Sequence, residues 1–442
     1  MTRLRRTKLH YTEEELEVLR SMNEKYIHVT YGSDSDVYAK SINEHGQTSW
    51  ECINARQFPQ RFLHKPLIKG ENAGKAWLKW QDKEHREGVY FYPSLDSAPS
   101  ILKNKLNTYI GLNAEELEGD VTPFLELGTK LISTEEESSV WEYVLDWIAH
   151  LIQKPTEKTS VAIALQGVPG GGKGSFVEPL LRIVGAYGKR LNGASMATGR
   201  FNAVIDQTLL LFLDEVSLLD TNKSDRLKAL ISEPELTVEP KGKEPRVIKN
   251  YSRLILATND RKIINASKRE RRYLIVETGS ALAQNTEFFS KYHDWLENNG
   301  VEYLLYYLRR RDIRNFNPHC APKTSVLRES ILSSQDTFGR FVINELNKSK
   351  PFGGGPLIEV SSIVNQFKAF ADRELPNMTQ AAARSIVGKR LKELGVPKIK
   401  GPSTTCYELK SKTEFALAFA NDQGLKLADF VDEGIFQEEV YS

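Results

Sequence analysis

One stretch, Val161 to Phe176, constrains this chain more than any other. It reads VAIALQGVPGGGKGSF, an apolar run that ends at Gly167 and leads into the spacing G-x-x-x-x-G-K. A glycine backbone can curl around an anion and aim several N–H groups at it, while the start of the next helix adds its positive dipole end. The stretch therefore predicts a strand, a phosphate-binding loop and a helix within an α/β fold.

The residues predicted to surround the phosphates are the loop glycines and the residues next to the lysine. They are Gly167, Gly170, Gly171, Gly172, Lys173, Gly174 and Ser175. Lys173 would meet the β- and γ-phosphates of ATP as a point charge. The position after the lysine commonly holds a Ser or Thr that binds Mg²⁺; here it is Gly174, so Ser175 is the candidate metal ligand. Pro179 should kink the following helix or delay its start.

A second apolar strand ends in two carboxylates. Residues 208–216 read TLLLFLDEV, and consecutive large apolar residues are typical of a central strand covered on both faces. Asp214 and Glu215 stand at its carboxyl end, where open α/β sheets bind ligands. Such a pair is often only a helix cap, but here it follows a phosphate loop. We expect Asp214 to bind Mg²⁺ and Glu215 to polarise the attacking water.

A third apolar run, Arg253 to Thr258, ends at Asn259. An amide there can hydrogen-bond the γ-phosphate and the lytic water, although Asn is also common in turns. Arg271 and Arg272 then precede another apolar strand. A guanidinium stabilises charge on a transferring phosphoryl group, and in ring ATPases a neighbouring subunit supplies it. We expect Asn259 and one of these arginines to act in catalysis.

Between these strands, residues 236–250 carry the pattern of a β-hairpin with a basic tip. Residues 241–272 contain eleven Lys or Arg against three acidic residues. Such a bias suits a nucleic-acid backbone, and it equally suits a solvated charged face. We predict Lys241, Lys243 and Lys249 as DNA contacts.

The overall composition limits the class of protein. The chain has 442 residues, 40% of them hydrophobic and 27% charged, which is ordinary for a globular protein with several domains. The net charge is only +2, so any affinity for nucleic acid must come from local clusters. Three widely spaced cysteines, without histidines at ligand spacing, indicate a reducing cytosol and no structural zinc. The absence of a long apolar run predicts a soluble cytoplasmic protein without a membrane partner.

The first part of the chain reads as an α+β domain. Residues 26–39 carry two β-rich runs around a turn, which is the pattern of a hairpin. Asp34 and Asp36 in that turn form a D-x-D, which in a primase could bind two metal ions but which turn chemistry explains more simply. Residues 50–112 interleave aromatic and basic side chains. These could stack bases, but we prefer the core of a small domain.

The order of the motifs resembles the superfamily 3 helicases, the AAA+ branch found in viral, phage and plasmid replication proteins. The likeness is greatest to the primase-helicases of phages and mobile elements. That family has a Walker A loop, a Walker B strand, a pore lysine on a hairpin, a third motif ending in Asn, and an arginine finger. The matching residues are Gly167 to Lys173, Asp214 with Glu215, Lys241 or Lys243, Asn259, and Arg271 or Arg272.

The resemblance implies a hexameric, ATP-driven DNA helicase of phage or mobile-element replication, acting in the cytoplasm of a bacterial host. ATP and Mg²⁺ would bind between subunits, and single-stranded DNA would pass through the ring pore with 3′ to 5′ polarity. The implied fold is an α/β AAA+ P-loop ATPase core with a central parallel sheet, an α+β N-terminal domain and a C-terminal winged-helix-like domain.

Composition shifts set the predicted boundaries. A polar run at 131–140 reads as a linker, and the glycine-rich run at 348–356 reads as a flexible break. The predicted domains are 1–133 (N-terminal α+β), 134–280 (ATPase core), 281–347 (helical lid), 357–421 (winged-helix-like, DNA-binding) and 422–442 (acidic tail). In the tail, Phe430 and Phe436 are candidates for docking on a partner.

The winged-helix prediction rests on helices at 359–373 and 379–394 followed by a strand at 404–409. Its basic residues would face duplex DNA, although a small helical domain with ordinary surface lysines fits nearly as well. They are Arg384, Lys389, Arg390 and Lys392.

Two other functions stay open. The chain could be an origin-binding replication initiator whose ATPase switches assembly, with duplex origin DNA as its partner. It could also be a primase-helicase that uses Asp34 and Asp36, or act with a separate primase or other replication proteins.

Overall fold

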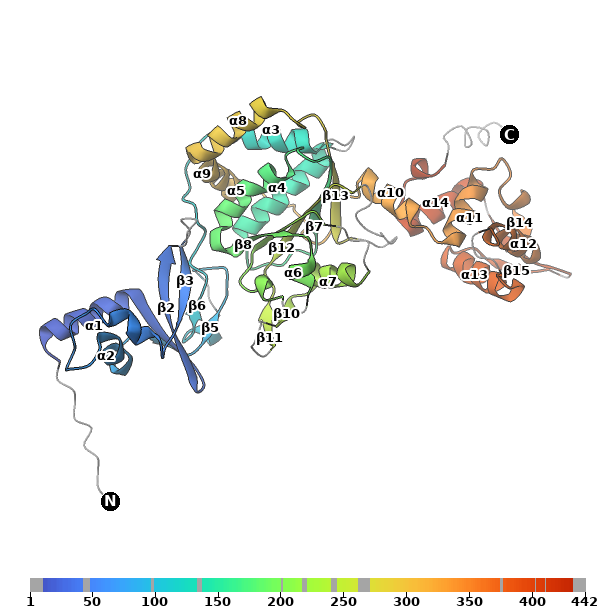
Figure 1. Ribbon diagram of the computed structural model, residues 1–442. Helices are drawn as coiled ribbons and strands as arrows, with labels where there is room; N and C mark the ends of the chain where they lie inside the picture. Colours follow the sequence, from blue (N-terminus) through green and yellow to red (C-terminus); the bar gives the residue numbers. More distant parts are fainter. Residues whose placement is uncertain are drawn as a thin grey trace, which may run out of the picture.

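The computed structural model describes residues 11–42, 48–96, 99–132, 137–199, 202–216, 221–239, 245–260, 271–373, 377–401, 403–409 and 411–431. Figure 1 shows an N-terminal, a central and a C-terminal part, in that order along the chain. None of the described helices is both long and apolar enough to span a bilayer.

The N-terminal part packs two helices against a small sheet of strand order β3-β2-β1-β4. Its elements are α1 (Glu13–Lys25), β1 (Tyr26–Tyr31), β2 (Asp34–Ile42), β3 (Thr48–Asn54), α2 (Ala73–Lys79) and β4 (His85–Arg86). Strands β1 and β2 pair antiparallel and form the predicted hairpin. Trp77 and Trp80 are buried, and the Trp77 indole donates to Asn23 Oδ1 at 2.8 Å. These two tryptophans are therefore core, as preferred from the sequence.

The central part is built on a parallel sheet of strand order β13-β7-β12-β9-β8. Its strands are β7 (Ala162–Gly167), β8 (Gly188–Asn192), β9 (Leu210–Asp214), β12 (Arg253–Thr258) and β13 (Tyr273–Thr278). Its main helices are α3 (Thr122–Leu131), α4 (Glu137–Gln153), α5 (Lys173–Val184), α7 (Thr221–Ser232), α8 (Thr286–Trp295) and α9 (Val301–Arg310). The three apolar runs predicted as central strands form β7, β9 and β12.

Smaller elements complete the central part. They are β5 (Val89–Tyr90), β6 (Leu106–Asn107), α6 (Ser195–Thr198) and the antiparallel hairpin of β10 (Glu235–Val238) and β11 (Arg246–Lys249). Much of the core of this part lies between the sheet and the helices α4, α5 and α9. Helix α5 starts at Lys173 without delay and keeps Pro179 in its interior.

The central part begins before residue 134, where we predicted the boundary. Phe124 on α3 stacks on Phe176 of α5 with ring centroids 5.2 Å apart, and Tyr109 packs on Tyr187 at 5.0 Å. The Tyr187 hydroxyl also accepts from the backbone N–H of Ile110 at 2.8 Å. We placed the boundary at residue 134 because the run 131–140 is polar. Buried aromatic contacts, however, attach the segment before that run to the core of the central part.

The C-terminal part contains the predicted break. Helix α10 (Ser325–Ser333) follows the central part, and α11 (Thr337–Leu346) packs with α12 (Val360–Ala371) through Phe341 and Phe367, whose ring centroids lie 5.5 Å apart. Phe352 is 2% exposed, and its backbone N–H donates to Glu345 Oε2 at 2.9 Å. The run 348–356 is therefore a turn inside one packed unit, because its single aromatic residue anchors it.

The rest of this part combines helices with a three-stranded antiparallel sheet of order β14-β16-β15. Its elements are β14 (Leu357–Glu359), α13 (Gln380–Glu393), β15 (Lys398–Lys400), β16 (Thr405–Glu408) and α14 (Lys412–Gln423). The two helices and the strand predicted here agree with α12, α13 and β16.

The packed chain continues beyond residue 421, where we predicted an acidic tail to begin. Phe430 is 7% exposed and lies 5.5 Å, ring to ring, from Phe419 on α14. It is therefore part of the chain's own core and not a free docking residue. Phe436 lies outside the described residues.

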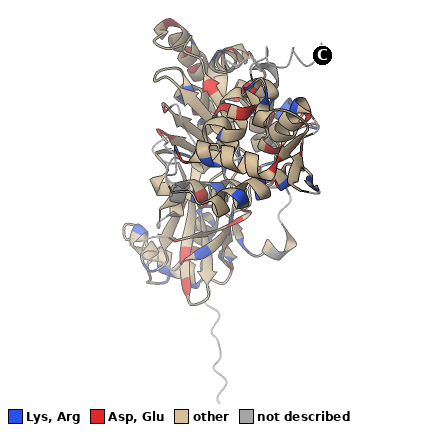
Figure 2. Ribbon diagram, turned by 90° about the vertical axis from the view of Figure 1, so that its right-hand side faces the viewer, with Lys and Arg blue, Asp and Glu red and all other residues tan. Residues whose placement is uncertain are grey.

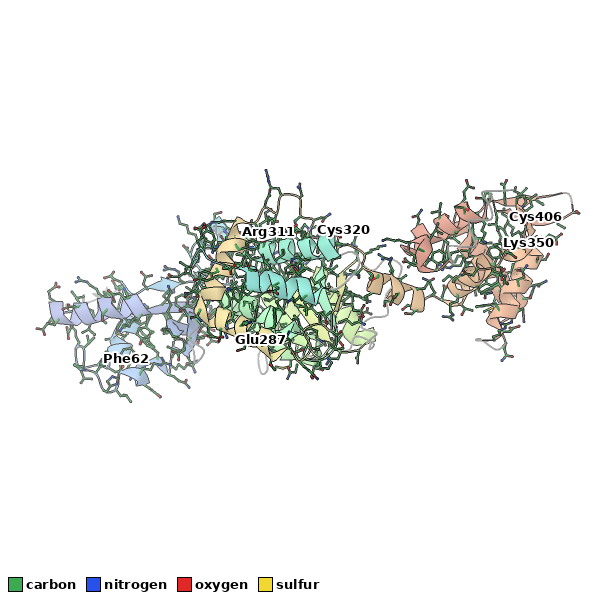
Figure 3. All side chains as sticks on the ribbon, turned by 90° about the horizontal axis from the view of Figure 1, so that it is seen from above. Phe62, Glu287, Arg311, Cys320, Lys350 and Cys406 are labelled. Carbon is green, nitrogen blue, oxygen red and sulfur yellow. The ribbon has the colours of Figure 1, made fainter. Side chains whose placement is uncertain are left out.

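Charges of both signs intermix over the described surface in the view of Figure 2. Figure 3 shows Cys320 on the central part and Cys406 on the C-terminal part, and no disulfide joins cysteines in the described residues.

The strand that ends at the candidate site is anchored at its other end by a buried arginine. Arg253 begins β12 and is 1% exposed; it donates to the carbonyl oxygens of Lys154 and Glu157 and to His150 Nδ1 at 3.0 Å. Burial, and then the charge of Arg253, lowers the pKa of His150 to about 4. His150 is therefore neutral at pH 7, and protonating it would bring two cations together.

We expect Phe352→Ala to destabilise the C-terminal part by about 3 to 5 kcal/mol, because it leaves a cavity between Phe341 and Phe415. Leu417→Ala, at a side chain 43% exposed on α14, is the matched control and should cost far less. Hydrogen exchange of α11 and α12 amides under increasing denaturant measures the difference. Equal protection in the two variants would show that the turn is not anchored by Phe352.

Acid should weaken the central part through His150. A histidine whose pKa is about 4 when folded and about 6.5 when unfolded takes up its proton more readily in the unfolded chain, so stability falls as pH drops from 6.5 towards 4. The loss is up to about 1.4 kcal/mol per pH unit. His150→Gln should flatten this dependence, measured by exchange of β12 amides at pH 7 and pH 5. The pKa of His28 in the N-terminal part is also lowered to about 4 by burial. The pH dependence of exchange in the N-terminal part should therefore stay the same in His150→Gln, which makes it an internal control.

Candidate functional site

The predicted phosphate loop connects β7 to α5. Gly170 and Gly172 have φ values of +74° and +98°, which side-chain-bearing residues rarely adopt. Gly167 lies against β13, where an added Cβ would come within 1.9 Å of Thr278 Oγ1 and 2.8 Å of its backbone oxygen. The loop can therefore follow this path only with glycine at these positions.

Lys173 begins α5, and its side chain turns back over the loop. Its Nζ donates to the carbonyl oxygens of Gly167 at 2.7 Å and Val168 at 2.9 Å, and to Asn259 Oδ1 at 2.9 Å. Burial lowers the pKa of Lys173, and the charge of Asp214 acts in the opposite direction. A cation is thus held between the loop and the end of β12.

Strand order explains why Asn259 reaches Lys173. Strand β12 lies between β7, which leads into the loop, and β9, which ends at Asp214. Because all three strands run parallel, their carboxyl ends meet at one edge of the sheet. The structure therefore brings Lys173, Asp214 and Asn259 together, although they are far apart in the sequence.

The acidic pair ends β9 in a strained conformation. Glu215 has a φ of +54°, unusual for a residue other than glycine, and its backbone N–H donates to Asp214 Oδ1 at 3.2 Å. The other carboxylate oxygen of Asp214 accepts from Arg190 Nη2 at 2.8 Å. The strain turns the chain so that both carboxylates border the cavity of the loop.

Arg190 is the site residue that sequence reasoning missed. It lies on β8, at the edge of the sheet, and pairs in register with Phe212 of β9. The segment GKRLN carries little apolar signal, so its place beside β9 could not be foreseen. The one available hint was an arginine shortly after the helix that follows the loop.

A cavity of about 380 Å³ joins these residues. Residues 169–175 form one wall, and Phe289 of α8 adds an aromatic side. Arg190, Asp214, Glu215 and Asn259 form the opposite wall. The size and the convergence of backbone and charged groups suit a phosphate-bearing ligand.

The donors present fit phosphate well and Mg²⁺ in part. Among the described residues, no group of three His, Cys, Asp or Glu side chains could hold a metal by itself. A Mg²⁺ ion here would need phosphate oxygens and waters beside Asp214, which is its usual coordination at nucleotide sites. Ser175 borders the cavity, and its backbone oxygen accepts from the Tyr292 hydroxyl at 3.1 Å.

The remaining predicted residues that the structure describes lie away from this cavity. Arg271 and Arg272 immediately precede β13, at the amino edge of the sheet, and neither borders the cavity of its own chain. Lys249 lies on β11 and pairs with Glu235 at 2.6 Å. Lys241 and Lys243 lie outside the described residues.

Asp34 and Asp36 belong to β2 of the N-terminal part. The described residues give them no cluster of three metal ligands. The primase hypothesis gains no support from their surroundings.

Comparison with known proteins finds a family model and a phage protein that are similar to part of the chain. A sequence model described as a family of unknown function (DUF5906) matches residues 165–272, which include the loop, the acidic pair and Asn259. A DNA primase-polymerase of Nitratiruptor phage NrS-1 is 26% identical over 168 residues. That match covers 37% of this chain and 23% of the relative, so the chain spans about a quarter of the relative's length.

Solved structures share the fold. The apo structure of the NrS-1 C-terminal region (305–718) superposes with a TM-score of 0.67 at 14% identity, over 90% of this chain and 99% of that one. The A form of the same region gives a TM-score of 0.67 over 89% of this chain. The chain is therefore similar in sequence to a phage DNA primase-polymerase and similar in fold to the C-terminal region of NrS-1.

Gly167→Ala tests the loop geometry. We expect about tenfold weaker binding of tripolyphosphate, used as a phosphate-bearing probe, or about 1.4 kcal/mol, because the new methyl group displaces the loop from Thr278. Gly388→Ala on α13, away from the loop, is the control, since its Cβ would lie 3.5 Å from the Tyr407 hydroxyl, an ordinary contact. Calorimetric titration measures both, and unchanged binding by Gly167→Ala would contradict the close approach.

Proposed function

We propose that this chain is an ATP-driven DNA helicase of the superfamily 3 type that acts on single-stranded DNA during phage or mobile-element replication in a bacterial cytoplasm. The observation that carries the proposal is the meeting of Lys173, Asp214 and Asn259 at one edge of a parallel sheet, beside a glycine loop. The similarity to a phage DNA primase-polymerase supports the replication setting.

Each side chain has a role in ATP hydrolysis that its position supports. The loop N–H groups and Lys173 bind the phosphates, and Asp214 with Ser175 would hold Mg²⁺. Glu215 takes a proton from the attacking water, and Asn259 orients that water while it contacts Lys173. Bound Mg²⁺ neutralises charge on the phosphates. The order of the parallel strands supports an AAA+ core.

The position of the arginines supports a ring. Arg271 and Arg272 lie at the opposite edge of the sheet from the phosphate loop, so they cannot complete the cavity of their own chain. A finger from either residue would have to reach the cavity of a neighbouring copy. We propose a homo-oligomer, a hexamer by family resemblance, with ATP between subunits and the β10–β11 hairpin facing single-stranded DNA through Lys241, Lys243 or Lys249.

The C-terminal part supports a second DNA contact. Its order of helix α11, strand, two helices and two further strands is that of a winged helix, and we propose that α13 contacts duplex DNA. Arg384, Lys389 and Lys392 are exposed on this helix. Arg390 is less available, because it pairs with Asp336 and Glu393. Because such a contact with duplex DNA would also suit an origin-binding initiator, that function is the second candidate.

The primase-helicase alternative with Asp34 and Asp36 stays an untested prediction, as does a partnership with a separate primase.

Lys173→Ala and Glu215→Gln test the proposal together. We expect Lys173→Ala to lose ATP binding, and Glu215→Gln to keep binding while hydrolysis falls by about a hundredfold or more. Lys130→Ala, at an exposed lysine paired with Glu126, is the control and should behave as the parent. The measurements are ATP turnover with and without single-stranded DNA, and unwinding of a forked duplex.

Unwinding that persists in Lys173→Ala would contradict the helicase proposal. So would turnover in a chain that stays monomeric and does not respond to DNA. Footprinting of an origin duplex by a chain that unwinds nothing would favour the initiator.

A further inference from the structure

We infer that Arg190 is a switch cation of this nucleotide site: it pairs with Asp214 before a nucleotide binds and transfers to the phosphates when one enters. The inference rests on the proposed function, because it requires a nucleoside triphosphate as the ligand. It adds a phosphate-binding residue that none of the sequence motifs contains.

The edge of the sheet positions Arg190. Strand β8 pairs parallel with β9, so that Arg190 lies beside Phe212 and Asn192 beside Asp214. The guanidinium lies 5.3 Å from the centre of the Phe212 ring, which gives it an aromatic support. From there Nη2 reaches Asp214 Oδ2 at 2.8 Å.

Gly174 of the loop lies beside this arginine. A Cβ built at position 174 would lie 3.4 Å from Arg190 Nη2 and 4.0 Å from Nη1. In G-x-x-x-x-G-K-[ST] loops this position carries the hydroxyl that binds Mg²⁺. Here the residue has no side chain, and a permanently charged guanidinium lies next to it. The change at 174 and the arginine on β8 therefore belong to one arrangement.

The pair conflicts with metal binding by Asp214. One of its carboxylate oxygens accepts from Arg190 and the other from the Glu215 backbone N–H. A Mg²⁺ ion that binds Asp214 directly must displace the guanidinium or share an oxygen with it. The displaced arginine then has two anions within the same cavity, the Glu215 carboxylate and the phosphate oxygens of a bound nucleotide, and the phosphates carry the greater charge.

Arg190 has the freedom to make this move. Its side chain is 47% exposed, and it borders both the 380 Å³ cavity of the loop and an adjoining cavity of about 780 Å³. Among the described residues it is therefore held by the Asp214 ion pair and the Phe212 ring, and not by close packing. A planar guanidinium can turn from a single hydrogen bond with a carboxylate to two parallel hydrogen bonds with a phosphate.

The test is a double-mutant cycle on nucleotide binding without metal. The full chain and its Arg190→Ala, Asp214→Asn and doubly substituted variants are titrated with a fluorescent ATP analogue in EDTA, and again with Mg²⁺. We expect Arg190→Ala to weaken metal-free binding by about tenfold or more, because a charge-assisted phosphate contact is lost. Asp214→Asn should tighten metal-free binding several-fold when Arg190 is present and leave it unchanged in the Arg190→Ala background.

Arg182→Ala is the control, since Arg182 pairs with Glu178 and Glu297 on the wall of the adjoining cavity and does not border the phosphate loop. Its metal-free binding should equal that of the parent chain. Thermal unfolding of every variant checks that the fold is kept.

Metal-free binding by Arg190→Ala at the parent affinity would overturn the inference. Tightening by Asp214→Asn that persists without Arg190 would also overturn it, because the gain would then come from reduced repulsion alone. A parent chain that binds no nucleotide with or without Mg²⁺ would overturn the proposed function as well. Nucleotide binding that follows the cycle in a chain without DNA-dependent turnover would overturn the helicase proposal alone.

Discussion

The hydrogen bond between the Lys173 ammonium and Asn259 is the contact on which the rest of the site depends. It joins the loop after β7 to the end of β12, and the same ammonium closes the loop on the carbonyl oxygens of Gly167 and Val168. A buried cation with three acceptors keeps its geometry before any ligand arrives. The loop is therefore held in its curled shape in advance, and the neighbouring carboxylates are positioned relative to it.

This contact is possible only because the sheet is parallel and buried on both faces. Strands β7, β9 and β12 are almost entirely apolar, so their register is held by packing. The polar side chains at the two ends of β12 are hydrogen-bonded. Arg253 donates to backbone carbonyl oxygens at one end, and Asn259 accepts from Lys173 at the other. The carboxyl edge is left free for charged groups that would be costly inside the sheet.

Aromatic contacts decide how the flanking segments attach. Phe124 binds α3 to α5, Phe352 binds the glycine-rich turn to α11 and α12, and Phe430 binds the end of the described chain to α14. Phe124 precedes the polar run at 131–140, Phe352 lies in the glycine-rich run, and Phe430 lies in the stretch predicted as an acidic tail. Boundaries drawn from composition failed at these places, because one buried ring outweighs several neighbouring polar residues.

The sequence by itself determined the local features of the molecule. The glycine spacing before Lys173, the apolar strands and the hairpin at residues 26–39 follow from short-range rules, and the structure has them where they were expected. Tertiary structure alone decided which ends of strands meet. The place of β12 between β7 and β9, the arrival of Arg190 beside Asp214 and the attachment of residues 106–132 to the core depend on pairings between distant segments. Local propensity does not determine those pairings, because strand order and packing depend on how the whole sheet is buried.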